Sequence, residues 1–82
     1  MSELIEKHIA ADASIQHGKL CFRGTRIPVY AVLELLEGGV SWKDVIGPDY
    51  YPGLTADHIR AALRFASEYA KNEEYTFFQK SA

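Results

Sequence analysis

Apolar side chains recur at helical spacing in the middle of the chain. The i, i+3, i+4, i+7 pattern, which places side chains on one face of a helix, is followed by Val29, Val32, Leu33 and Leu36. Pro28 suits the first turn, because its missing N–H would have no helical partner there. Gly38 and Gly39 end the pattern, since glycine accepts the left-handed backbone of a C-cap. The sequence predicts a helix at about 29–38.

Two further helices are marked by capping residues. Ser41, followed by Asp44 three residues later, forms a capping-box pattern, and Gly47-Pro48 stops the segment, so we expect a short helix at 41–47. Thr55 caps the next helix. Its apolar face is supplied by Ile59, Ala62, Leu63 and Ala66. This third helix is expected at 55–71.

The N-terminal third lacks a helix-length pattern. Residues 1–7 are expected to be a flexible lead-in, and Leu20 and Phe22 alternate with Cys21 and Arg23 as in a short strand. The prediction is a mainly α fold over residues 8–72. It consists of a three-helix, homeodomain-like helix-turn-helix bundle behind a short β-hairpin or extended arm, followed by a C-terminal tail at 73–82. The alternative is a small helical bundle, because three-helix packing serves many functions.

Size and charge narrow the class of protein. The single cysteine Cys21 cannot form an internal disulfide, so we expect it to pack as a small apolar residue. Because a chain of 82 residues buries only a modest core, we also expect a homodimer, which would add stability. No run is long and apolar enough for a membrane helix, and residues 1–8 lack the apolar core of a signal peptide, so we expect a cytoplasmic protein. We expect no metal and no cofactor, because His8, His17 and His58 lie far apart along the sequence.

One segment is basic although the net charge is −2. Residues 17–26 contain no acid, and their candidate DNA-contacting side chains are Lys19, Arg23, Thr25 and Arg26. Guanidinium groups suit phosphate oxygens and guanine edges, and a threonine hydroxyl can donate to phosphate. The alternative is that the arginines pair within the fold. Their partners would then be Glu34, Glu37 or Asp44.

The polar face of the third helix forms a second candidate site. A recognition helix would bring His58, Arg60 and Arg64 to the duplex, since Arg60 and Arg64 are one turn apart. The alternative is an ordinary solvated face, in which Arg64 and Glu68 form an i, i+4 ion pair.

The C-terminal tail carries the aromatic side chains Tyr75, Phe77 and Phe78. Exposed aromatics are costly unless covered, so we expect them to dock onto a partner protein or to fold back onto their own domain or a dimer mate. We do not expect an enzyme, because the sequence has no glycine-rich phosphate loop, nucleophile elbow or paired metal-ligand motif.

Three segments together resemble domain-of-unknown-function family 433: GKLCFRGTRIPV at 18–29, VLELLEGGVSWKDV at 32–45 and YPGLTADHIRAALRFA at 51–66. Some members are described as VapB-type antitoxins. The resemblance implies a homeodomain-like fold behind a β element, and a role as the labile partner of a PIN-like nuclease toxin that also binds operator DNA. Leu20 stands where the family usually has proline, and the linker before the third helix is longer than usual.

The resulting hypothesis is an antitoxin-like regulator that binds its operator as a homodimer and neutralises a PIN-like nuclease toxin. The alternatives are a protein-interaction module without DNA binding, or a small structural domain.

Overall fold

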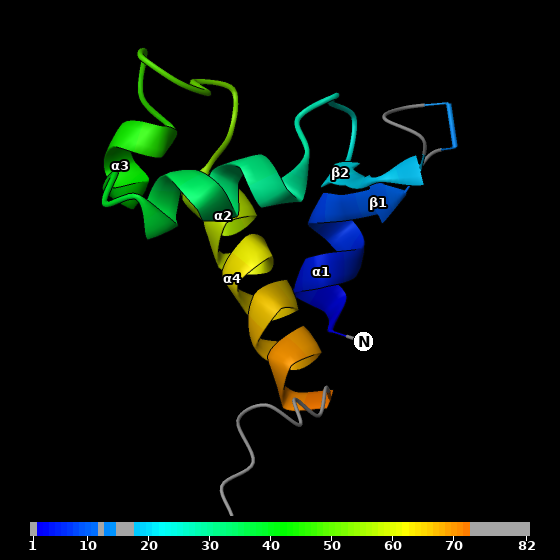
Figure 1. Ribbon diagram of the computed structural model, residues 1–82. Coiled ribbons are helices and arrows are strands. Elements are labelled where there is room, and N and C mark those ends of the chain that lie inside the picture. The colour runs from blue at the N-terminus through cyan, green and yellow to red at the C-terminus, as the bar shows by residue number, and fades with distance from the viewer. Residues whose placement is uncertain (1, 12, 15–17, 73–82) are drawn as a thin grey trace, which may run out of the picture.

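The computed structural model describes residues 2–11, 13–14 and 18–72. The elements, in chain order, are α1 (Glu3–His8), β1 (Ile9–Ala11), β2 (Leu20–Phe22), α2 (Val29–Glu37), α3 (Trp42–Val45) and α4 (Ala56–Asn72). Helices therefore predominate, with a small two-stranded antiparallel hairpin near the N-terminus, which confirms the prediction at this level. Figure 1 shows α2 lying across the upper part of α4, with α3 at the end of α2 far from the hairpin. No described helix meets the length and apolarity needed to cross a bilayer.

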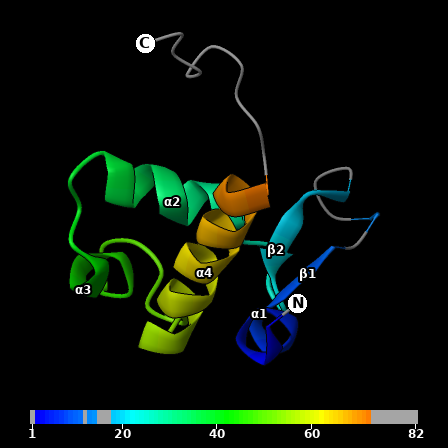
Figure 2. The ribbon, with the colours of Figure 1, turned by 90° about the horizontal axis from the view of Figure 1, so that it is seen from below.

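The prediction of a flexible lead-in at residues 1–7 is wrong, because this segment contains α1. The Ser2 side chain caps the helix by accepting a hydrogen bond of 3.1 Å from the Ile5 N–H. Ile5 is buried in the core, and α1 packs against α4, as both views of the ribbon show (Figures 1 and 2). A six-residue helix with a single fully buried side chain leaves little periodicity to detect in the sequence.

The hairpin follows α1 without a break. Ile9 pairs with Phe22, and Ala10 pairs with Cys21, in an antiparallel register. Ile9 and Phe22 both belong to the core, and Phe22 is completely buried. Cys21 is a buried free thiol, as the sequence predicted. The predicted strand at Leu20–Phe22 is confirmed, and the register directs Phe22 toward the helices.

The three predicted helices are found, with bounds that differ by one or two residues. α2 ends at Glu37 and is followed by Gly39, whose φ of 98° is left-handed. The Val40 N–H donates to the Leu35 carbonyl and the Gly39 N–H to the Leu36 carbonyl, as in a Schellman motif. The Ser41 side chain caps α3 by accepting from the Asp44 N–H. The predicted caps therefore fix both ends of the α2–α3 connection.

The core lies where α2 and β2 meet α4. Its fully buried large side chains are Phe22, Val29, Val32 and Val45. On α4, Ala61 and Ala62 are also fully buried, and small side chains at buried positions let the neighbouring elements pack close to the helix backbone. This packing leaves one long side of α4 facing solvent.

Candidate functional site

The segment Arg23–Arg26, called the turn below, is held by its own hydrogen bonds. The Thr25 hydroxyl donates to the Phe22 carbonyl at 2.8 Å and accepts from the Ile27 N–H at 3.0 Å. Gly24 has a φ of 78°, a left-handed conformation that glycine adopts without strain. The hydroxyl of Thr25 therefore shapes the turn, and its proton is already donated within the chain.

Arg23 joins three elements of the fold. Its guanidinium donates to the Glu6 carbonyl from Nε at 3.1 Å and from Nη2 at 2.7 Å, and Nη2 also donates to the Ile9 carbonyl at 3.1 Å. A cation is favourable here, because carbonyls at the end of a helix such as α1 carry partial negative charge. The acceptors are main-chain oxygens. The sequence had offered the carboxylates of Glu34, Glu37 and Asp44 as possible partners, and Arg23 does not use them.

Arg26 differs from Arg23. It is exposed, and no described side chain or carbonyl pairs with its guanidinium. The turn borders a hollow that is floored by the hairpin at Ala10, Ala11 and Cys21. Of the two arginines of the turn, Arg26 is thus the one whose guanidinium has no partner in the described part of the chain.

The predicted recognition face of α4 carries two surface ion pairs. Arg60 lies 3.4 Å from Asp57, and Arg64 lies 3.9 Å from Glu68. The side chains of both arginines and of Asp57 are exposed, and that of Glu68 is partly exposed. The predicted Arg64–Glu68 pair is confirmed. Such pairs contribute little stability and exchange readily for another anion. Arg60 and Arg64 border one hollow with Leu4, so the structure brings these two residues together.

His58 faces the interior of the fold. Its ring packs edge-on against His8, with ring centroids 4.9 Å apart, and against Phe22, with centroids 5.5 Å apart. Its Nδ1 accepts a hydrogen bond of 2.9 Å from the Thr55 N–H, as the third helical residue does in a capping box. Partial burial and the neighbouring His8 lower the pKa of His58 below its ordinary value of 6.5, while Asp57 opposes the shift. A neutral, half-buried cap is poorly suited to a phosphate contact.

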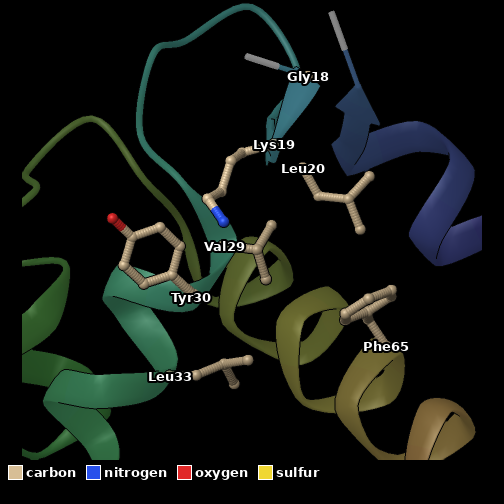
Figure 3. Close-up of a pocket in the computed structure, with 7 residues that line it drawn as sticks. All are labelled: Gly18, Lys19, Leu20, Val29, Tyr30, Leu33 and Phe65. Carbon is tan, nitrogen blue, oxygen red and sulfur yellow. The ribbon is translucent and has the colours of Figure 1, made fainter. Parts of the chain in front are cut away.

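Sequence reasoning missed an apolar groove between β2, α2 and α4. The groove has a volume of about 430 Å³ and is lined by Gly18, Lys19, Leu20, Val29, Tyr30, Leu33 and Phe65. Figure 3 shows Tyr30, Leu33, Leu20 and Phe65 surrounding the same hollow. Its walls come from three distant parts of the sequence, so no local pattern could have revealed it. The detectable signal was the presence of Tyr30 beside the core positions of α2.

Lys19, which the sequence predicted as a DNA contact, lies at this groove. The Lys19 Nζ is 5.7 Å from the centre of the Tyr30 ring, within the range of a cation–π interaction. Tyr30 remains 46% exposed. Lys19, the arginines of the turn and the arginines of α4 thus border three separate hollows. The predicted partner-binding residues Tyr75, Phe77 and Phe78 lie outside the described residues.

The geometry defines a small, mainly helical domain with an N-terminal hairpin and an exposed apolar groove. A family model described as "Protein of unknown function (DUF433)" matches residues 9–66, and the chain belongs to this family, as the sequence motifs indicated. The matched segment contains the turn and all of the described residues that line the groove. Comparison with curated proteins and with solved structures gives no match.

Proposed function

We propose that the chain is a protein-interaction module whose groove binds an extended segment of a partner protein. The observation that carries the proposal is the exposed Tyr30 ring, with the Lys19 ammonium above it, at the mouth of an apolar hollow. Aromatic residues with an exposed face are enriched among the residues that dominate binding energy at protein interfaces. The groove is suited to a segment that supplies an aromatic side chain for the hollow and a carboxylate for Lys19.

The hydrogen bonds that several predicted DNA-contacting residues already make within the fold also favour a protein-interaction module. Arg23 and Thr25 hold the turn, and His58 caps α4, so three of the residues expected to contact DNA already have partners within the fold. The family resemblance favours a PIN-like nuclease toxin as the protein that supplies the bound segment. In that case the module would be an antitoxin that acts by occupying part of the toxin surface.

A display library of random twelve-residue peptides tests this proposal. The library is selected on the full chain and on the Phe77→Ser/Phe78→Ser variant, which removes two of the three aromatic side chains of the chain's own tail as competitors. Peptides with an aromatic and an acidic residue should be enriched, and their affinity should fall at least about fivefold in Tyr30→Ala, as for a residue that contributes to an interface. Tyr50→Ala is the matched control, because Tyr50 is similarly exposed but lies outside the groove. Equal effects of the two substitutions, or no enrichment, would contradict the proposal.

A second proposal keeps operator binding by a homodimer, with α2, α3 and α4 as a helix-turn-helix unit. It is favoured by the exposed Arg26, which has no partner among residues 2–11, 13–14 and 18–72, and by Arg60 and Arg64, whose weak surface ion pairs leave them available to phosphate. Residues 46–55 separate α3 from α4, a longer connection than the tight turn of such a unit. The phosphate contacts would then dominate over base readout.

Fluorescence anisotropy with duplex DNA from upstream of the chain's own coding sequence tests this second proposal. Affinity should fall steeply with salt, and Arg26→Ala should reduce the slope of log K against log salt by about one. Lys43→Ala, on α3, serves as the charge-matched control. Binding that is absent, or that is equally sensitive to both substitutions, would exclude a role for the turn in DNA binding.

A further inference from the structure

We infer that the chain's own C-terminal segment, residues 73–82, occupies the groove and competes with the partner. This inference rests on the proposed function, because it names a regulator of the same site. The segment carries Tyr75, Phe77 and Phe78 within four residues. The groove offers apolar walls that three aromatic side chains can cover.

The path along α4 leads from the groove to the start of this segment. Phe65 lines the groove, and Tyr69, one turn later, packs against it with ring centroids 6.2 Å apart. Tyr69 is 54% exposed, and Asn72, the last residue of α4, follows three residues after it on the same face. Aromatic surface therefore extends from the hollow to Tyr69, about one helical turn before the end of α4.

The length of the chain permits the return to the groove. Phe65 and Asn72 are separated by about 10 Å along the helix axis, at a rise of roughly 1.5 Å per residue. Phe78 follows Asn72 by a stretch of extended chain that reaches about 20 Å. The aromatic side chains thus reach the level of Phe65 when the chain turns back along α4.

The side chains of the segment are acidic on balance, with Glu73 and Glu74 against Lys80, whereas the groove carries the cation Lys19. Glu73 and Glu74 precede the aromatic residues, and residues 73–78 contain no basic side chain. Among the described residues that line it, the groove has Lys19 and no acidic side chain. At physiological salt the attraction extends over roughly 8 Å, so it favours the approach of the segment without needing a fixed ion pair.

Attachment to the same chain makes even a weak contact effective. A short tether gives an effective concentration on the order of 1 mM, so a segment that binds in trans with a Kd of about 0.1 mM would fill the groove roughly nine-tenths of the time. The apparent affinity for a partner segment then falls about tenfold, because only the open fraction of molecules can bind it.

The test uses a fluorescent synthetic peptide with the sequence of residues 73–82, titrated into three full-length proteins. These are the wild type, Phe77→Ser/Phe78→Ser, and the control Thr76→Ala/Gln79→Ala, which alters the same segment without removing an aromatic ring. The peptide should bind the aromatic variant about tenfold more tightly than the wild type or the control. Adding Tyr30→Ala to the aromatic variant should abolish this gain.

Two independent readouts keep the inference separable from the proposed function. Backbone amide shifts of Lys19, Leu33 and Phe65 should change between wild type and the aromatic variant, while those of Trp42 on α3 should not. Equal peptide affinity with unchanged shifts would overturn the inference, whereas the library selection on the same variant separately decides whether the groove binds peptides at all. A doubled mass of the wild type in analytical ultracentrifugation, lost in the aromatic variant, would also overturn it, because the segment would then be exchanged between two copies.

Discussion

The Nη2 atom of Arg23 lies 2.7 Å from the carbonyl oxygen of Glu6, the residue two positions before the end of α1. This contact ties the N-terminal helix to the turn that follows β2. Since the same nitrogen also donates to Ile9, the guanidinium holds α1, β1 and the turn in one arrangement. Arg23, which the sequence predicted as a DNA contact, therefore also has a structural role in joining the hairpin to α1.

Arg23→Ala should lower the free energy of unfolding by about 1–2 kcal/mol, because the Glu6 and Ile9 carbonyls lose a charged donor. Urea denaturation measures this change. Arg26→Ala is the control in the same turn and should stay within roughly 0.5 kcal/mol of wild type, since Arg26 is exposed and unpaired among the described residues. If the two substitutions destabilised the chain equally, the tie between Arg23 and α1 would not hold.

Thr25→Val should destabilise the fold by about 1–2 kcal/mol while preserving the shape of the side chain. Valine cannot donate to the Phe22 carbonyl or accept from the Ile27 N–H, so one main-chain donor loses its partner. Thr25→Ser keeps the hydroxyl and should cost less than half as much. Thermal denaturation of both variants distinguishes a hydrogen-bonding role from a packing role, in which the serine variant would be the weaker protein.

Gly24→Ala should cost about 1 kcal/mol, because an alanine at a φ of 78° is strained although nothing lies within 4 Å of its added Cβ. Gly53→Ala provides the control, since Gly53 has equally open surroundings and no left-handed backbone. The difference in melting temperature between these two variants measures the backbone effect alone. Equal stability of the two would contradict a strained conformation at residue 24.

The stability of the chain should decrease as the pH falls below 6.5, through His58. Its pKa is lowered in the folded state, so the unfolded chain binds the proton first, and protonation favours unfolding. The stabilisation is complete above pH 6.5 and is lost progressively below it. A proton on Nδ1 would also remove the acceptor for the Thr55 N–H.

Urea titrations at pH 7.5, 6.5 and 5.5 measure this dependence. His58→Gln should flatten it, because glutamine accepts the same hydrogen bond in a capping box and does not titrate. The comparison between wild type and variant isolates His58 from His8, which remains in both proteins. An identical pH dependence in the two proteins would assign the effect to other groups.

The sequence predicted local features well and long-range contacts poorly. Ser41 and Gly39 fix helix ends through hydrogen bonds to residues within five positions, so their roles can be recognised from spacing. Arg23 binds carbonyls 14 and 17 residues away, and main-chain acceptors leave no signature in side-chain pattern. His58 carried a capping signal three residues after Thr55, but the usual capping-box residue is glutamate or glutamine.

The position of α1 limits how far this protein can be truncated at its N-terminus. The family model matches residues 9–66, yet Ile5 fills part of the core and the carbonyl of Glu6 receives Arg23. A fragment trimmed to the matched segment would open a gap beside α4, and the Arg23 guanidinium would keep the Ile9 carbonyl but lose the Glu6 carbonyl as an acceptor. The smallest autonomous folding unit of this chain therefore begins upstream of the matched segment, and shortened versions should retain the residues from Ser2 onward.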